Sequence, residues 1–299
     1  MNAMKLTVPL FVVLAIGASP GRAAPVLGSD LARFSVLGAS TVTNTGATTL
    51  TGDLGVSPGS AITGKATITV NGTHAATAGN PSVHEADATA TSAQTQLAAA
   101  KASLALLGPG TLEPADLAGL TLLPGVYTVP TGTSNLSGTL TLDGGGNANA
   151  FWVFQSPSTL ITSFGSVVDV VNTGAGAGVF WNIGSSATLG AGTSFEGNLL
   201  ALDSITVGNS VTLGCGRALA QTGAVTLDTD TVSIACLGTG EEGSNGLSGG
   251  LDVPVGGGVP TPLPFAPVSP AALPEPGTLA LVGLGLVATL ASRRTAPRR

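Results

Sequence analysis

Charged and aromatic side chains are scarce in this 299-residue sequence. Charged residues make up 9% of the chain and aromatic residues 4%, whereas 43% is hydrophobic and 44 residues are glycine. Ordinary soluble domains carry about 25% charged residues, so this composition departs strongly from theirs. Small side chains allow strands and corners to pack closely, which favours a tightly wound β architecture.

Several function classes lack the residues that they need. The net charge is −6, and the paired arginines lie at the extreme C-terminus, which argues against nucleic-acid binding. A nucleophile elbow, a Walker loop and an HExxH motif are all missing. The two histidines, His74 and His84, flank a loop and a helix start, and we interpret both as surface residues. We therefore predict no catalytic residue and no metal site.

Five aspartates keep one enzymatic alternative open. Polysaccharide-cleaving β-helical enzymes use carboxylate clusters, so a cluster of these residues would suggest such chemistry. Aspartate is also a common turn residue, and the favoured interpretation places Asp143, Asp228 and Asp230 at corners. The residues concerned are Asp143, Asp169, Asp203, Asp228 and Asp230.

The N-terminus has the features of a secretory signal, and a short membrane anchor is the alternative. Lys5 precedes an apolar core over residues 6–16, and small residues allow cleavage after Ala23 or Ala24. Export would place the two cysteines, Cys215 and Cys236, in an oxidising compartment, where a disulfide is expected rather than a metal pair. Closing this loop of about 20 residues is worth roughly 3 kcal/mol in the chain-entropy model.

A short unit recurs between residues 185 and 234. Thr188, Thr206 and Thr226 lie at the centres of three short strands, at intervals of 18 and 20 residues. A Gly or Asp corner and a second alternating strand follow each of them. A repeat of about 20 residues is typical of a stacked solenoid, in which each coil covers the next.

One helix interrupts the strands. Ser82 and Glu85 form a capping box, and apolar residues recur at spacings of three and four until Gly108. We predict a helix over residues 82–107 that packs lengthwise along the solenoid, with a coiled-coil dimer as the weaker alternative. Two similar aromatic strands, residues 151–155 and 179–183, are placed in the interior.

Alternation along each strand predicts which residues face outward. If Phe195, Leu213 and Val232 point inward, the hydroxyl residues that precede them point outward and align across three coils. If Leu50 also points inward, its two neighbours Thr49 and Thr51 point outward on the early coil. Such a face is rigid and poorly charged, and it could hold ordered water and dock on a crystalline surface. The candidate face consists of Thr45, Ala47, Thr49, Thr51, Ser194, Thr212 and Thr231.

Two alternatives weaken the assignment of this face. Threonine is a favourable strand residue anywhere, so its presence alone is a weak signal. The rival face carries Thr188, Thr206 and Thr226, and the helix could cover it.

The C-terminal part changes in composition. Residues 237–273 are rich in Gly, Pro and Ser and are interpreted as a flexible linker. Pro274, Glu275 and Pro276 follow, then an apolar run over residues 278–291 that is short for a full membrane span. The arginines after this run are typical of a positive-inside stop.

Several segments resemble the DUF3494 family of ice-binding-like domains. The opening motif is residues 50–59 (LTGDLGVSPG), and the resemblance extends over residues 27–235. Residues 45–48 (TGAT) fit a Thr-(Ala/Gly)-x-(Thr/Asn) motif that some members carry on the ice face. The further matching segments are LTLLPGVY at 120–127, AFWVFQ at 150–155, VFW at 179–181, FEGNLLA at 195–201 and GRALA at 216–220.

The resemblance implies an all-β fold, an irregular right-handed β-solenoid (β-helix) of triangular section with one long α-helix alongside. Members bind ice through one flat face and use no cofactor. The C-terminus resembles a PEP-CTERM sorting signal, with Pro274, Glu275 and Pro276 as its motif. This tail implies export, an exosortase-type sorting enzyme as partner, transient membrane contact, and a cell-surface or extracellular-matrix location.

The expected organisation is therefore a signal peptide over residues 1–24, an ice-binding-like domain over 25–236, a linker over 237–273 and a sorting segment over 274–299. The expected function is non-enzymatic ice binding or ice adhesion. The alternative is a surface adhesin or exopolysaccharide-matrix protein of the same fold, with a surface polysaccharide as its partner.

Overall fold

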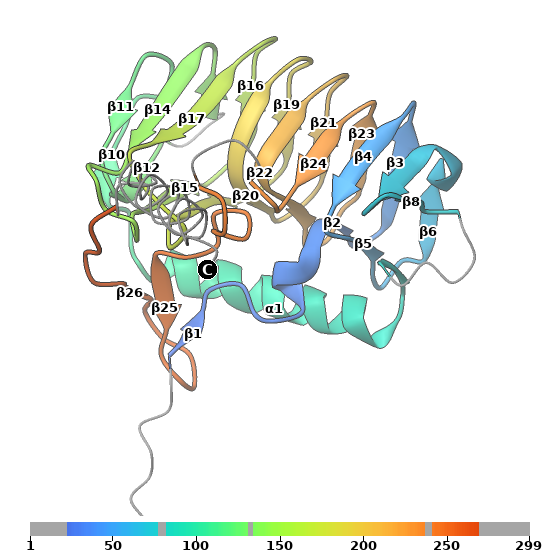
Figure 1. Cartoon of the computed structure of the whole chain (residues 1–299), viewed down its shortest axis with the longest axis horizontal. Coiled ribbons are helices and arrows are strands. Elements are labelled where there is room, and N and C mark those ends of the chain that lie inside the picture. The colour runs from blue at the N-terminus through green and yellow to red at the C-terminus, as the bar shows by residue number, and fades with distance from the viewer. Residues whose placement is uncertain (1–22, 77–81, 131–133, 237–240, 269–299) are drawn as a thin grey trace, which may run out of the picture. The chain divides into compact units, whose positions relative to one another are not determined.

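A computed structural model describes residues 23–76, 82–130, 134–236 and 241–268. The protein is mostly β, with one α-helix among the described residues. The described residues up to Ala266 belong to one compact unit, in which parallel strands are stacked side by side (Figure 1).

The chain visits three rows of parallel strands in turn. The first row is a seven-stranded sheet, which has the order β13 (Ser134–Leu136), β16 (Leu160–Thr162), β19 (Ala187–Leu189), β21 (Ile205–Val207), β23 (Val225–Asp228), β3 (Thr41–Thr45) and β6 (Ala61–Thr63). Its central strands bury the first and third residue and turn the middle one outward, as the alternation predicted.

The second row, here called the front row, starts from β11 (Thr121–Leu122), β14 (Thr139–Asp143) and β17 (Val167–Val171). It continues through the first residues of β20 (Ser194–Ala201) and β22 (Thr212–Ala220), then through β24 (Thr231–Ser233), β4 (Thr48–Thr51), β7 (Ile68–Val70) and the short antiparallel β8 (Thr73–His74). The later residues of β20 and β22 pass into the third row.

The third row, here called the helix row, contains β10 (Thr111–Leu112), β12 (Gly125–Thr128), β15 (Phe151–Ser156) and β18 (Gly178–Ile183). Beyond β20 and β22 it continues with β2 (Phe34–Gly38), β5 (Asp53–Val56) and β9 (Val83–Glu85). The N-terminal strands β3 and β4 pair with β23 and β24, so the blue and orange coils of Figure 1 lie side by side.

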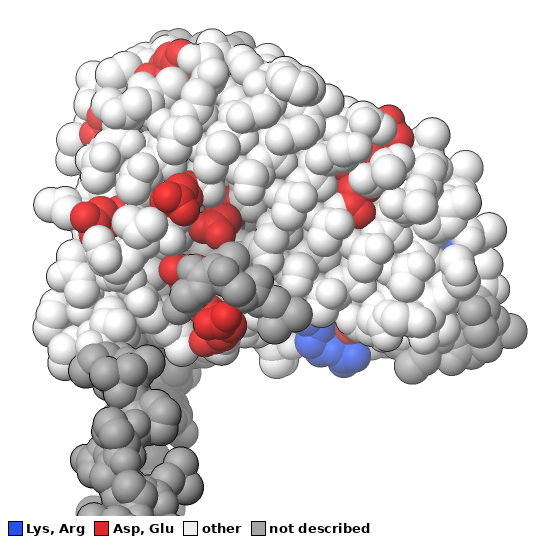
Figure 2. Space-filling model, turned by 45° about the horizontal axis from the view of Figure 1, so that its top comes forward, with Lys and Arg blue, Asp and Glu red and all other residues white. Residues whose placement is uncertain are grey.

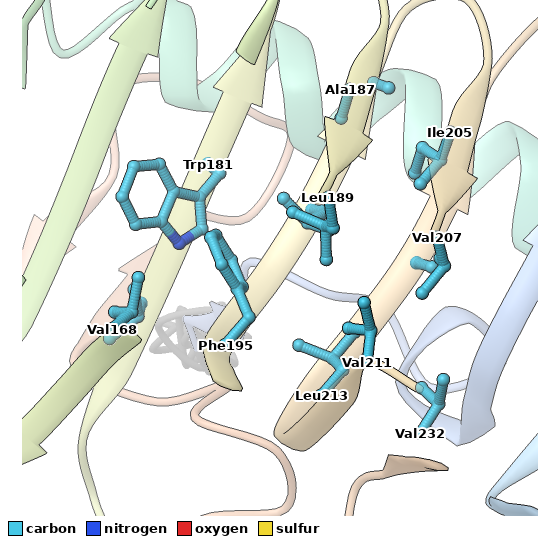
Figure 3. Close-up of a cluster of buried hydrophobic side chains, with 14 of the residues drawn as sticks. Val168, Trp181, Ala187, Leu189, Phe195, Ile205, Val207, Val211, Leu213 and Val232 are labelled. Carbon is cyan, nitrogen blue, oxygen red and sulfur yellow. The ribbon is translucent and has the colours of Figure 1, made fainter. Parts of the chain in front are cut away.

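Large apolar side chains fill the space between the rows. Trp152 and Trp181 are 0% and 2% exposed, and the Trp181 ring stacks on Phe154 at a centroid distance of 3.9 Å. Figure 3 shows Trp181, Phe195 and Leu213 pointing into this core from neighbouring coils. The predicted interior position of the two aromatic strands is confirmed for these rings, whereas Phe180 faces the helix.

Helix α1 (Ala88–Ala105) lies lengthwise on the helix row (Figure 1). Its buried stripe packs against a second apolar cluster that includes Leu37, Val153, Phe180, Leu200 and Leu219. Alanines early in the stripe allow the helix to approach the sheet closely. The stripe consists of Ala90, Ala93, Leu97, Ala100 and Leu104.

The predicted helix start is wrong by six residues. Residues 83–85 form β9, because their backbone pairs with β5, and Ala86 has a positive φ of 53° that a helix does not allow. Asp87, not Ser82, is the N-cap residue, and its carboxylate accepts a hydrogen bond from the Ala90 N–H at 2.8 Å. His84 is 8% exposed and contacts Asp87 at 2.7 Å, so its prediction as a surface residue is also wrong.

The interpretation of residues 237–273 as a flexible linker is wrong for residues 241–266. Strands β25 (Leu251–Val253) and β26 (Thr261–Pro262) form a three-stranded antiparallel sheet with β1 (Ala24–Pro25). Leu247 and Leu251 are buried against the rest of the unit. The boundary predicted at residue 236 therefore divides a folded unit.

Buried Arg217 gives one physical reason for this extension. Its side chain is 0% exposed, and burial lowers its pKa to about 9. The guanidinium donates hydrogen bonds to the carbonyls of Asn245 and Gly246 at 2.8 and 3.1 Å. It also donates to the Ala32 carbonyl and to Asn198 Oδ1. The C-terminal segment thus supplies two of the acceptors that a buried cation requires.

The predicted disulfide between Cys215 and Cys236 is present. The hydroxyl of Ser244 lies 3.6 and 3.2 Å from the two sulfur atoms, so the bridge also contacts the C-terminal segment.

Within the described part of the chain, the one α-helix is not of a length and hydropathy that would cross a bilayer. The predicted signal peptide, apart from Ala23 and Ala24, and the predicted sorting segment lie outside the described residues.

Candidate functional site

The front row presents a column of hydroxyl side chains. Cα pairing places Ser194 opposite Thr212, Thr212 opposite Thr231, and Thr231 opposite Thr49. These four residues are exposed, and Thr69 extends the column half-buried on the next strand. We call this set the first column: Ser194, Thr212, Thr231, Thr49 and Thr69.

A second, shorter column runs beside the first. Ser233 pairs with Thr51, and each lies two residues after a member of the first column on the same strand. The intervening residues Val232 and Leu50 are 0% exposed, as are Phe195 and Leu213 on the neighbouring strands. Since alternate residues face opposite sides of a strand, the buried set holds both columns outward.

Thr45 and Ala47 lie at the corner between the seven-stranded sheet and the front row, and both are exposed. Thr45 ends β3 and pairs with Asp228, so it belongs to the edge of the seven-stranded sheet and not to the first column. Gly46 has φ of 73°, and a Cβ atom there would lie 2.2 Å from Thr229 Oγ1 on the next coil. Glycine is therefore required for the coils to approach at this corner.

The seven-stranded sheet carries a comparable column. Pairing aligns Thr188 with Thr206, Thr206 with Thr226, and Thr226 with Thr43, and Thr63 follows. The expectation that the helix could cover this rival face is wrong, because α1 packs on the helix row. Both hydroxyl faces are therefore uncovered by the helix, and they meet at the corner of Thr45.

Sequence reasoning missed four of these hydroxyl residues. Thr69 stands between buried Ile68 and Val70, and Thr43 between buried Val42 and buried Asn44, so the alternation rule could have found Thr69 and, from one apolar neighbour, Thr43. Thr63 and Ser233 end short strands, where alternation over three residues gives a weaker signal.

Acidic side chains mark one limit of the front row. Burial raises the pKa of Glu196 to about 8, although its carboxylate accepts a hydrogen bond from the Val170 N–H at 2.9 Å, and the nearby Glu241 and Asp169 carboxylates raise it further. From β22 to β7 the two columns contain uncharged residues alone. Much of the surface in Figure 2 is likewise uncharged, and acidic side chains gather in a few places.

Four of the five aspartates of the enzymatic alternative lie at turns or strand ends, whereas Asp169 is an exposed residue in the middle of β17. Asp143 accepts a hydrogen bond from the Gly145 N–H at 2.9 Å, and Asp230 accepts from the N–H groups of Val211 and Asp228. Asp203 accepts from Ser185 and Thr222 hydroxyls. Among the described residues, no three His, Cys, Asp or Glu side chains are placed to hold a metal ion.

Comparison with known proteins gives the family. A family model described as ice-binding-like matches residues 36–233, which include both hydroxyl columns of the front row. The chain belongs to the ice-binding-like family. A second model, the PEP-CTERM protein-sorting motif, matches residues 272–294 and confirms the predicted sorting motif at Pro274, Glu275 and Pro276.

Relatives of this ice-binding-like protein share most of its length. An ice-binding protein of Nostoc sp. (strain HG1) is 44% identical over 259 residues, which cover 86% of this chain and 82% of the relative. An ice-binding protein of Flavobacterium frigoris (strain PS1) is 32% identical over 217 residues, which cover 68% and 74%.

Solved structures are similar to the same region. An ice-binding protein from an Antarctic biological consortium matches with a TM-score of 0.63 and 34% identity, over 78% of this chain and 96% of that one. An ice-binding protein of the Antarctic ascomycete Antarctomyces psychrotrophicus matches with a TM-score of 0.63 and 33% identity, over 71% and 98%.

Proposed function

We propose that this protein is an exported, non-enzymatic ice-binding protein that contacts ice through the first and second columns of the front row. The observation that carries the proposal is the strand register, which aligns hydroxyl residues of successive coils while their neighbours are buried. The ice-binding relatives support the choice of ligand.

The proposed architecture is a right-handed β-solenoid. Three rows of parallel strands are visited in turn, and each coil pairs with the next in every row. Crossover connections between parallel strands of one sheet are almost always right-handed, which supports this hand. Each coil buries the apolar surface of the neighbouring coil, and this stacking holds the outward faces flat along the solenoid.

Such a face suits a crystalline ligand. Neighbouring strands lie ~4.8 Å apart, and alternate residues on one strand lie ~6.6 Å apart on the same side. Hydroxyl and methyl groups therefore recur on a regular, uncharged grid that can order water. Rigidity comes from the packed interior behind it, where Leu50, Leu213 and Val232 are fully buried.

The front row is favoured over the rival face for two reasons. Over β24 and β4 it presents two adjacent hydroxyl columns, so its grid extends in two directions. The rival column places the Asp228 carboxyl group beside Thr45 at its edge and continues into Ile161, which is 41% exposed, whereas the first column continues into the half-buried Val167. A charge and an exposed branched apolar side chain both interrupt a regular hydroxyl array.

Export is part of the proposal. The sorting motif over residues 272–294 supports recognition by an exosortase-type enzyme and a cell-surface or extracellular-matrix location. The disulfide between Cys215 and Cys236 fits an oxidising compartment.

Thermal hysteresis and ice-crystal shaping test the proposed function. We expect the purified exported protein to shape growing ice crystals and to open a gap between melting and freezing temperatures. Absence of both effects, together with binding to surface polysaccharide, would replace ice binding by the adhesin function. Release of reducing sugar from a polysaccharide would instead indicate an enzyme.

A further inference from the structure

Hydrogen-bonded polar side chains, three of them buried and Thr67 exposed, connect the coils at the corner that joins the two hydroxyl faces. We call this set the corner spine: Asp230, Thr48, Asn44 and Thr67. Asp230, Thr48 and Asn44 are 2%, 1% and 6% exposed, so these side chains lie behind the surface that would meet a ligand. These buried side chains therefore form a polar network that would not itself touch ice.

The corner spine ties successive coils together. Asp230 Oδ1 accepts a hydrogen bond from the Val211 N–H at 2.9 Å, and its Oδ2 accepts from the Asp228 N–H at 2.7 Å. The Asp230 N–H donates to Thr48 Oγ1 at 3.1 Å, and that hydroxyl donates to Asn44 Oδ1 at 2.7 Å.

Asn44 extends the series of hydrogen bonds to the next corner. Its amide donates to the Gly46 carbonyl and to Thr67 Oγ1, both at 2.9 Å. The Thr67 hydroxyl in turn donates to the Gly64 carbonyl at 2.9 Å. Four consecutive corners are thus connected through side-chain hydrogen bonds.

Three of the connected residues lie directly before a residue of the first column. Val211 precedes Thr212, Asp230 precedes Thr231, and Thr48 precedes Thr49. Moving any of these corner residues would move the exposed hydroxyl that follows it. A rigid supporting network of this kind is what holds a binding array within a fraction of an ångström.

Thr48 also changes the interpretation of the sequence motif at residues 45–48. The resemblance placed this motif on the ice face, yet the structure exposes Thr45 and Ala47 and buries Thr48. The last threonine of the motif is therefore placed to hold the corner and not to touch a ligand.

We propose that Asp230 and Thr48 are positioning residues of the ice-binding face, which set the register between the first-column hydroxyls on β22, β24 and β4. This inference rests on the proposed ice-binding function. Asp230 and Thr48 are buried, so they would act on ice binding by positioning the exposed hydroxyls and not by touching ice.

The test compares three substitutions at the corner in the full exported protein. Thr48→Val keeps the shape but removes the hydroxyl that Asp230 N–H and Asn44 Oδ1 bind, and Asp230→Asn replaces one N–H acceptor by a donor. Both variants should lose most of the thermal hysteresis near 0 °C while staying folded by circular dichroism. Thr48→Ser restores the hydroxyl and should keep the hysteresis of the unchanged protein.

Leu200→Ala is the matched control for stability. Leu200 is 0% exposed beneath the helix, away from the corner, so the substitution lowers the melting temperature without touching the corner spine. It should keep its thermal hysteresis at temperatures where it is folded. If the corner spine served stability alone, the loss of thermal hysteresis in each variant would instead be proportional to its decrease in melting temperature.

The outcomes separate this inference from the proposed function. If the unchanged protein shows no hysteresis, the ice-binding proposal fails and the positioning role fails with it. If the unchanged protein is active and folded Thr48→Val or Asp230→Asn is equally active, the positioning role alone is overturned. Equal loss in Leu200→Ala would overturn it as well. Should Thr48→Val fail to fold, Asp230→Asn and Thr48→Ser still decide the question.

Discussion

Removal of the C-terminal segment after residue 236 should destabilise the domain strongly. Arg217 would lose the Asn245 and Gly246 carbonyls, and the Asn198 amide would lose the Leu247 carbonyl at 2.8 Å. Hydrogen bonds to charged groups contribute about 1.5–3 kcal/mol each. The burial of Leu247 and Leu251 contributes about 1.5–3 kcal/mol per side chain.

These contributions are upper estimates, because water can enter and neighbouring groups can relax. A net loss on the order of 5 kcal/mol is comparable with the whole stability of many domains, which is about 5–15 kcal/mol. For a domain of this size each kcal/mol shifts the melting temperature by about 2–4 °C, so we expect a decrease of roughly 10–20 °C.

Thermal unfolding of chains 24–236 and 24–266, followed by circular dichroism, measures this difference. Combining the truncation with Arg217→Met provides the control. If Arg217 is the main contact of the segment, truncation should cost less in the variant than in the unchanged chain. Equal melting temperatures of the two chain lengths would refute this reasoning and restore the boundary at residue 236.

Three further predictions concern single groups. Because folding raises the pKa of Glu196 from 4.5 to about 8, its contribution to stability is greatest below pH 4.5 and is lost as the pH rises to 8. Glu196→Gln should therefore flatten the fall in melting temperature across this range, and an unchanged slope would contradict the assignment. Asp87→Ala removes the helix N-cap and should cost about 1 kcal/mol in denaturant unfolding. A cost near zero would exclude the cap as a stabilising contact. Alkylation of the non-reduced protein should leave Cys215 and Cys236 unmodified, and two labelled thiols in its mass spectrum would exclude the bridge.

The inward and outward residues of the coils could be predicted from the sequence because their cause is local. Alternation has a period of two, so buried Phe195, Leu213 and Val232 fix the opposite orientation of their neighbours. The same reasoning applies to the apolar stripe of α1. These patterns depend on the nearest few residues and survive in any stacked arrangement.

Long-range contacts account for what the sequence did not reveal. Residues 83–85 resemble a helix start locally, but pairing with β5 makes them a strand. Residues 241–266 have the composition of a linker, yet two of their carbonyl groups accept hydrogen bonds from Arg217. No local sequence pattern predicts this contact. The stacking of β3 on β23 likewise joins segments that are far apart in the chain.

The central claim, that the front row is the ice-binding face, is tested most directly by one matched pair of substitutions. Thr212 and Thr206 are both exposed threonines on short strands, one in the first column and one in the rival column. We predict that Thr212→Tyr removes thermal hysteresis with little change in melting temperature, because a bulky ring breaks the flat array and leaves the core untouched. The Thr206→Tyr variant should keep its thermal hysteresis. Loss of activity in Thr206→Tyr, with full activity in Thr212→Tyr, would contradict the account and assign ice binding to the seven-stranded sheet.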